Sequence, residues 1–153
     1  YGIIYKDNNV QVNAFTVNHG RLQSLAYKFI TEDKTIVVSG DTCPVEIMKE
    51  KARDADILLH ECEYTKGLET RSEQWQIYHR NVHTLSVDLA KLAIVAKPKL
   101  LVTYHRIYHM NVFDRSFDLK QEMEIRKQAI LEEIKDAGYN GKVINGEDLD
   151  IFE

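Results

Sequence analysis

The sequence predicts one domain of the α/β class (α+β by some schemes), in which a β-sheet is packed against helices. Its 153 residues suit a single domain and are enough to bury a core. With 44% hydrophobic and 29% charged residues, the composition is that of a folded globular protein rather than a disordered one. Strand-like segments come first in the chain, and strands then alternate with helix-like segments.

The first strand-like segments are short and separated by polar turns. Segments 2–6 and 10–17 flank the turn Asp7-Asn8-Asn9, which predicts a hairpin. Segment 22–30 predicts a third strand. The β-branched run that begins at Thr35 predicts a buried fourth strand, and it stops in Ser-Gly-Asp-Thr. Asp41 in that turn is therefore expected at the rim of the sheet, where open α/β sheets bind ligands.

The periodicity changes after this turn. Pro44 is expected in the first turn of a helix. Segment 55–59 predicts a strand that ends at His60-Glu61, and segment 64–82 predicts a short helix inside a long loop. Thr84 is a candidate cap for a helix with an apolar stripe over 85–96. Segment 100–103 predicts a strand that ends at Tyr104-His105, and segment 106–114 predicts a loop. A long helix is expected to begin at Ser116, with Phe117 as its first apolar residue, and to end at Gly138. Segments 142–145 and 149–152 predict two terminal strands.

Charge and cysteine content exclude several classes of protein. A formal net charge of −4 argues against a strongly basic nucleic-acid binder, although it leaves room for a local basic patch. Cys43 and Cys62 are too few for a disulfide framework, which favours a reducing compartment. No stretch has the length and apolarity of a membrane span, and no stretch of these residues has the charged-then-apolar pattern of a secretory leader. A cytoplasmic location is the resulting expectation.

Residues that can bind metal recur where the predicted strands end. They are His19, Asp41, the pair His60-Glu61, and His105. A single histidine after a strand is usually an ordinary loop residue, but strand ends can converge on one rim. Imidazole and carboxylate ligands suit zinc, iron or manganese. Because a carboxylate has two oxygens that can bridge two metals, Asp41 is the expected centre of such a site.

Several of these segments together resemble a known family. They are VNHG, LAYKF, IVVSGDTCP, ADILLHE, HT, LAIVAKPKLLVTYH and the closing GEDLDIF. In this order they resemble the carboxy-terminal half of a metallo-β-lactamase-fold hydrolase of the ribonuclease Z and arylsulfatase-like branch. The resemblance covers nearly the whole chain. It implies that residues 1–153 are the carboxy-terminal portion of one such domain, half of an αββα sandwich with a mixed sheet and helices on one face.

The resemblance also implies a division of roles. His19 would bind a first metal, Asp41 would bridge two metals, and His105 would bind the second. His83 would assist catalysis without binding metal, and Glu61 would orient His83. The implied cofactors are two divalent metal ions, with zinc favoured and manganese or iron as alternatives.

The remaining histidines are given no site role. His60 is expected to face the core, because its neighbour Glu61 fits the motif. His79 fits the family pattern less well and is expected to be a loop residue. His109 has no counterpart in the resemblance and is also interpreted as a loop histidine.

Two features depart from the family pattern. The motif His-x-His-x-Asp-His, which supplies further metal ligands in the family, does not occur in the chain. Together with the start at Tyr1, its absence leads to the expectation that the amino-terminal half lies outside this sequence. Only 21 residues separate His19 from Asp41, where ribonuclease Z inserts a long tRNA-gripping arm. RNA is therefore a disfavoured substrate.

The preferred hypothesis is a metal-dependent hydrolase that cleaves a phosphodiester or related ester of small-molecule size with a metal-activated water. With three implied metal ligands for two metals, the chain alone is expected to bind metal weakly and to be inactive. An alternative is a catalytically inactive binding or assembly module, and a further one is a generic α/β ligand-binding domain. The expected partner is the missing amino-terminal half or a second copy of the chain. No association with a membrane is expected.

Overall fold

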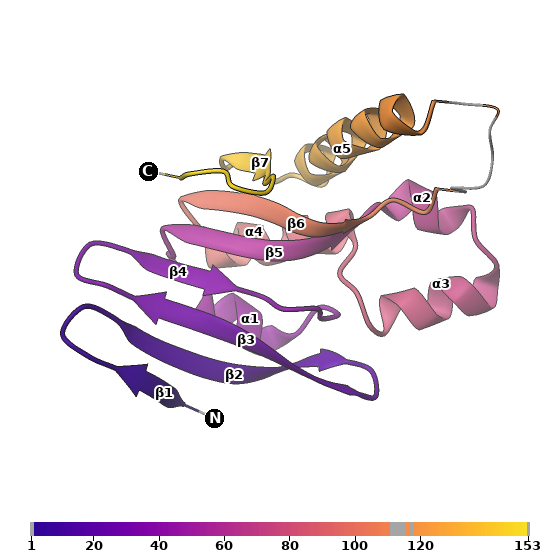
Figure 1. Cartoon of the computed structure of the whole chain (residues 1–153). Helices are drawn as coiled ribbons and strands as arrows, with labels where there is room; N and C mark the ends of the chain where they lie inside the picture. Colours follow the sequence, from indigo (N-terminus) through magenta and orange to yellow (C-terminus); the bar gives the residue numbers. More distant parts are fainter. Residues whose placement is uncertain (1, 111–115, 117, 153) are drawn as a thin grey trace.

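The computed structural model describes residues 2–110, 116 and 118–152, and it has the predicted layered arrangement of a mixed sheet and helices (Figure 1). Its seven described strands lie in the order of the sequence, from β1 to β7. Neighbours from β1 to β4 pair antiparallel, and neighbours from β4 to β7 pair parallel. Phe117 and residues 111–114 of the predicted loop lie outside the described residues.

The antiparallel half confirms the strands expected from the turn signals. It comprises β1 (Ile3–Lys6), β2 (Gln11–His19), β3 (Leu22–Ile30) and β4 (Thr35–Val38). The side chain of Asp7 closes the first turn, because its Oδ1 accepts hydrogen bonds from the backbone N–H groups of Asn9 and Val10, both at 2.8 Å. Such local carboxylate caps are the reason that Asp favours turns.

The parallel half is built from strands joined by helical crossovers. Its elements are α1 (Glu46–Lys51), β5 (Ile57–Glu63), α2 (Thr65–Glu69), α3 (Glu73–Arg80), α4 (Ser86–Ala96), β6 (Leu100–Ile107), α5 (Leu119–Asp136) and β7 (Val143–Asn145). Because each parallel strand lies beyond the previous one in the same direction, right-handed crossovers place α1, α4 and α5 on one face of the sheet. None of the helices in the described part of the chain is long and apolar enough to cross a bilayer.

Several expected boundaries were wrong. The strands β5 and β6 continue past His60-Glu61 and Tyr104-His105, to Glu63 and Ile107, because they pair with each other along that length. Pro44 precedes α1, whose cap is Val45. Segment 64–82 forms two helices rather than one.

The predictions for Thr84 and for residues 149–152 were also wrong. Thr84 does not cap α4, since its Oγ1 donates to the backbone oxygen of Thr42 at 2.6 Å instead. Residues 149–152 form no strand, and the side chain of Phe152 packs against the sheet. Both changes come from tertiary contacts that local patterns do not encode.

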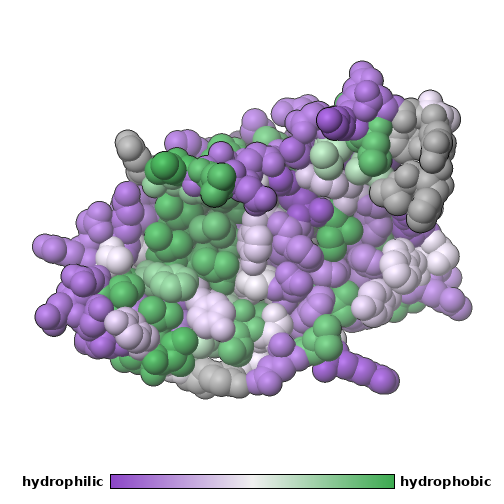
Figure 2. Space-filling model, viewed as in Figure 1, coloured by the Kyte–Doolittle hydropathy of each residue, from purple (hydrophilic) through white to green (hydrophobic). Residues whose placement is uncertain are grey.

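The two faces of the sheet are covered differently. On one face, Val37, Leu58 and Leu101 pack with Met48, Leu89 and Ile130 of the helices in the main core. On the other face, Ile57, Leu100 and Val102 form a smaller cluster with partly buried neighbours, and no described helix covers it. Figure 2 shows this face: hydrophobic residues gather at its left and centre, and hydrophilic residues lie toward the carboxyl edge of the strands on the right.

Candidate metal-binding rim

Asp41 is held at the carboxyl edge of β4 by a turn that requires glycine. Gly40 has φ +60°, and a Cβ on it would lie 2.5 Å from the backbone oxygen of Leu25. Only glycine fits there without displacing β3. The backbone oxygen of Asp41 accepts a hydrogen bond from Ser24 Oγ at 2.7 Å, so the turn is anchored to β3. The carboxylate of Asp41 is thus left partly exposed at the rim.

His105 approaches Asp41 from β6. Its Nδ1 lies 3.2 Å from Oδ1 of Asp41. The backbone of His105 has φ 43°, and the pairing of β5 with β6 shifts register here. A left-handed non-glycine residue at a bulge is a local strain that redirects a side chain. The bulge lets a residue inside a long strand reach the rim.

His19, the last residue of β2, enters the rim from the antiparallel half. Its Nδ1 lies 2.8 Å from the backbone oxygen of Val82, so Nδ1–H donates and Nε2 is the nitrogen with a free lone pair. The ring centroid of His19 lies 5.0 Å from that of His83.

Glu61 connects several segments at this edge of the sheet through hydrogen bonds. Its side chain is fully buried, and its Oε1 accepts hydrogen bonds from the backbone N–H of Thr42 at 3.0 Å, the backbone N–H of Thr84 at 3.2 Å, and His83 Nδ1 at 3.2 Å. One carboxylate oxygen thus joins the turn after β4, the start of α4 and a rim histidine. Its other oxygen, Oε2, has no hydrogen-bond partner among the described residues.

The Glu61–His83 pair retains its proton more tightly than the isolated side chains would. Burial raises the pKa of Glu61, against the opposing hydrogen bond and charge of His83. For His83, burial lowers the pKa, but the hydrogen bond and charge of Glu61, together with the charges of Glu63 and Asp41, outweigh it, so the net pKa is raised. A raised pKa keeps a larger fraction of His83 protonated near neutral pH.

The structure therefore brings all five of the predicted site residues to one edge of the sheet; we call His19, Asp41, Glu61, His83 and His105 the rim cluster. The ring of His83 lies 5.8 Å from that of His105. Within the cluster, the three donors that lie within 4.8 Å of one another are those of Glu61, His83 and His105. Imidazole and carboxylate donors of this kind fit zinc. Oε2 of Glu61 is a buried acceptor with no described partner, which fits a cation at this edge of the sheet. The group within reach of one ion differs from the predicted ligand set: it includes Glu61 and His83, to which the resemblance gave no metal, and leaves out His19 and Asp41.

A second group of ligand-type side chains was missed from the sequence. Glu63, His79 and His109 each place one donor atom within 4.8 Å of the others. His79 and His109 were interpreted as loop histidines, yet His79 lies in the last turn of α3 and is buried. Two patterns could have indicated the group: Glu63 shares a strand face with Glu61, and His79 precedes His83 by one helical turn. For His109 we find no such signal.

The prediction that His60 faces the core is confirmed, since its side chain is fully buried. Its Nδ1 lies 2.8 Å from the backbone oxygen of Glu61. Burial lowers the pKa of His60 to about 4, and the hydrogen bond offsets this only in part.

This buried histidine predicts a loss of stability in mild acid. In the unfolded chain the imidazole takes up a proton below about pH 6.5, whereas in the folded chain it does so only below about 4. Its contribution is complete above the higher value and is lost as the pH falls toward the lower one. Urea unfolding should show that His60→Gln removes about 2 kcal/mol of the stability difference between about pH 7.5 and about pH 5. Equal pH dependence in both proteins would contradict this.

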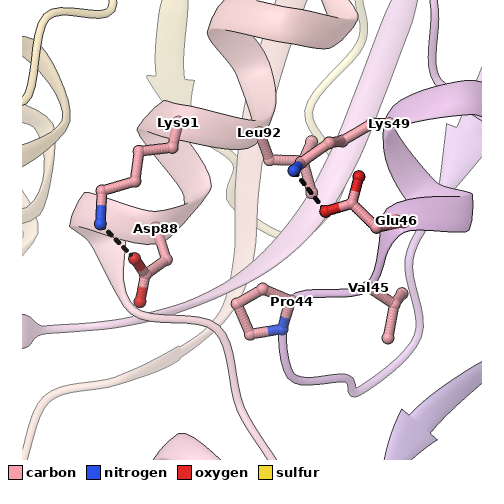
Figure 3. Close-up of a pocket in the computed structure, with 7 residues that line it drawn as sticks. All are labelled: Pro44, Val45, Glu46, Lys49, Asp88, Lys91 and Leu92. Carbon is pink, nitrogen blue, oxygen red and sulfur yellow. Dashed lines mark hydrogen bonds and ion pairs between the residues drawn. The ribbon is translucent and has the colours of Figure 1, made fainter.

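Two surface hollows differ in their relation to the rim. One, of about 510 Å³, is lined by Tyr104, His105, Arg106 and residues 146–148, and it opens beside the rim cluster. Another, of about 280 Å³, lies between α1 and α4 (Figure 3). Its charged side chains pair locally, Lys49 with Glu46 at 2.6 Å and Lys91 with Asp88 at 2.7 Å. Only the first hollow is placed to receive a molecule that reacts at the rim.

Comparison with known proteins bears on this arrangement. No family model matches the chain. The metallo-β-lactamase-fold protein YhfI from Bacillus subtilis superposes with a TM-score of 0.70 at 15% identity, covering 97% of this chain and 52% of that one. Human tRNase Z, short form, superposes with a TM-score of 0.63 at 18% identity, covering 99% of this chain and 44% of that one. The chain therefore has the metallo-β-lactamase fold and spans about half of each of these structures.

Part of the chain is also similar in sequence to curated proteins. Ribonuclease Z of Ignicoccus hospitalis is 35% identical over 79 residues, which are 52% of this chain and 24% of that protein. The zinc phosphodiesterase ELAC protein 2 homolog of Caenorhabditis elegans is 36% identical over 59 residues, 39% of this chain and 7% of that protein. These segments of the chain are thus similar in sequence to ribonuclease Z, and the matched region spans about a quarter or less of each of these curated relatives.

Proposed function

We propose that this chain is the carboxy-terminal portion of a metal-dependent phosphodiester hydrolase and supplies one side of its two-metal site. His19 would bind one metal, His105 the other, and Asp41 both. The single observation that carries the proposal is that β2, β4, β5, β6 and the start of α4 deliver these residues, with Glu61 and His83, to one edge of the sheet.

Within this proposal, Glu61 and His83 act as a positioned proton donor. Glu61 holds Nδ1 of His83, so Nε2 is the nitrogen that faces away from the carboxylate and can protonate a leaving oxygen. Bound divalent metals would supply Lewis acidity and a hydroxide nucleophile near neutral pH. Glu61 also fixes the turn that carries Asp41, through the N–H of Thr42. A change at Glu61 should therefore disturb both proton donation and ligand placement.

The substrate class is inferred from the relatives. Two relatives named above are a ribonuclease Z and a zinc phosphodiesterase homolog, and these names support a phosphodiester substrate. The short connection from His19 to Asp41 leaves no room for a long RNA-binding arm, which favours a smaller diester. In the adjacent hollow, Arg106 already donates to the backbone oxygens of Thr103 and Gly146 and pairs with Glu147, so it shapes the wall.

The missing ligands are proposed to come from an amino-terminal half of the same domain. That half would also cover the sheet face on which Ile57, Leu100 and Val102 lie without a helix. Coverage of 52% and 44% of the two solved chains supports this division. The second candidate function is an inactive binding or assembly module, and absence of the His-x-His-x-Asp-His motif from the full-length protein would favour it.

Hydrolysis of bis(p-nitrophenyl) phosphate in the presence of zinc tests the proposal. We expect no turnover above the zinc-buffer blank from the 153-residue chain, and turnover from a protein that joins it to an amino-terminal segment with the histidine motif. Asp41→Asn in the joined protein should abolish that turnover. A joined protein that folds and binds zinc but leaves the diester intact would favour the binding module instead.

A further inference from the structure

A second cluster of ligand-type side chains lies beside the rim cluster, and the proposed hydrolysis uses none of its members. Glu63 is the last residue of β5, His79 lies in the last turn of α3, and His109 follows β6. Oε1 of Glu63 lies 2.7 Å from Nδ1 of His79 and also contacts Nε2 of His109. Three elements that are distant in sequence thus converge on one carboxylate.

This cluster is closed to solvent and incompletely satisfied. The side chains of Glu63, His79 and His109 are 0%, 9% and 4% exposed. Oε2 of Glu63 has no hydrogen-bond partner among the described residues. Nδ1 of His79 makes no hydrogen bond of acceptable geometry, although Oε1 of Glu63 is only 2.7 Å away. A buried carboxylate oxygen without a partner is costly, so the arrangement calls for a further positive group.

The donor set matches a transition-metal ion. Two imidazoles and one carboxylate form the His₂Glu combination that binds zinc. The donor atoms lie within 4.8 Å of one another, close enough for one ion to contact all three after small side-chain adjustments. Oε2 of Glu63 can complete the coordination if the carboxylate binds through both oxygens. Oxygen and nitrogen donors without sulfur disfavour Cu(I) and iron–sulfur clusters.

We propose that Glu63, His79 and His109 form a separate buried site for one divalent transition-metal ion, of the zinc class. The ion would join β5, α3 and the segment after β6. The ring of His79 lies 5.5 Å from that of His83, and His109 follows His105 by four residues. A metal at this site therefore stabilises the wall against which two rim residues are positioned.

Zinc retention by the 153-residue chain tests this site without any assay of hydrolysis. The weak metal binding expected above concerns the three implied ligands of the rim, not this cluster. After gel filtration in a buffer that contains a weak chelator, we therefore expect about one equivalent of zinc per chain, measured by inductively coupled plasma mass spectrometry. The matched variants are Glu63→Gln and His109→Gln, which should lose this zinc, and Asp41→Asn, which should keep it. X-ray absorption spectroscopy of the bound zinc should show two imidazole ligands. Added zinc should raise the melting temperature of the wild type and of Asp41→Asn, but not that of Glu63→Gln or His109→Gln.

The outcomes separate this site from the rim. Zinc retained by both Glu63→Gln and His109→Gln would overturn the inference, as would its loss in Asp41→Asn or its absence from the wild type. If Glu63→Gln fails to fold by circular dichroism, His109→Gln decides, because that change lies outside the sheet and helices. Failure here leaves diester hydrolysis by the joined protein untouched, so the two proposals fail independently.

Discussion

His83→Ala should lower kcat for phosphodiester hydrolysis about 10²- to 10⁴-fold in the protein that joins this chain to its amino-terminal half. In the proposed mechanism, Nε2 of His83 donates the proton to the leaving oxygen, and Glu61 positions the ring through Nδ1. The loss should be larger for a diester whose leaving group is phenol than for one that releases p-nitrophenol, because the more basic oxygen needs the proton more. Steady-state kinetics with both diesters measures this.

The control for this substitution is Asn81→Ala, an exposed position in the same connection before α4. It should leave kcat within about 2-fold of the wild type. Zinc content should be unchanged in His83→Ala, since the proposal gives this residue no metal. Equal losses for the two leaving groups would contradict a proton-donor role. Loss of zinc together with activity would make His83 a metal ligand instead.

Glu133→Ala should destabilise the chain by about 3 kcal/mol. Glu133 lies on α5, is 6% exposed, and accepts hydrogen bonds from the backbone N–H groups of Thr65 and Lys66, both at 3.0 Å. It also accepts from the hydroxyl of Ser86. Removing the carboxylate leaves the first two N–H groups of α2 without their partner, and the hydroxyl of Ser86 keeps only its hydrogen bond with Thr65 Oγ1.

Glu132→Ala is the matched control, with the same substitution on the neighbouring, exposed position of α5. Urea unfolding should place it within about 0.5 kcal/mol of the wild type. Equal effects of the two substitutions would mean that Glu133 does not join α5 to α2 and α4 as the structure indicates.

The antiparallel strands were predictable because their signals are local. The turn at Asp7 and the alternating β-branched residues are sufficient to fix β1 and β2, and β3 was predicted with its observed ends, Leu22 and Ile30. Strand ends in the parallel half were not predictable in this way. β5 and β6 extend past their apolar runs because they pair with each other, and the polar residues His60, Glu61 and His105 therefore lie within strands.

Site residues were predictable where they come directly at or after the end of a strand that is recognisable in the sequence. Asp41 and His19 lie at strand ends, and their order along the chain, together with the family resemblance, suggested a shared rim. The group of Glu63, His79 and His109 was not predictable, because it depends on how α3 and the segment after β6 fold back on β5. His109 carries no local signal, since its partners are 30 and 46 residues away in the sequence.

Anomalous X-ray scattering at the zinc edge, from crystals of the joined protein, is the most direct test of the proposed site. The account predicts two peaks at the rim, both within about 2.2 Å of an oxygen of Asp41, with imidazole nitrogens of His19 and His105 at about 2.0–2.1 Å from one peak each. The absence of anomalous peaks at the rim would contradict the account. So would zinc bound at the rim without Asp41 among its ligands.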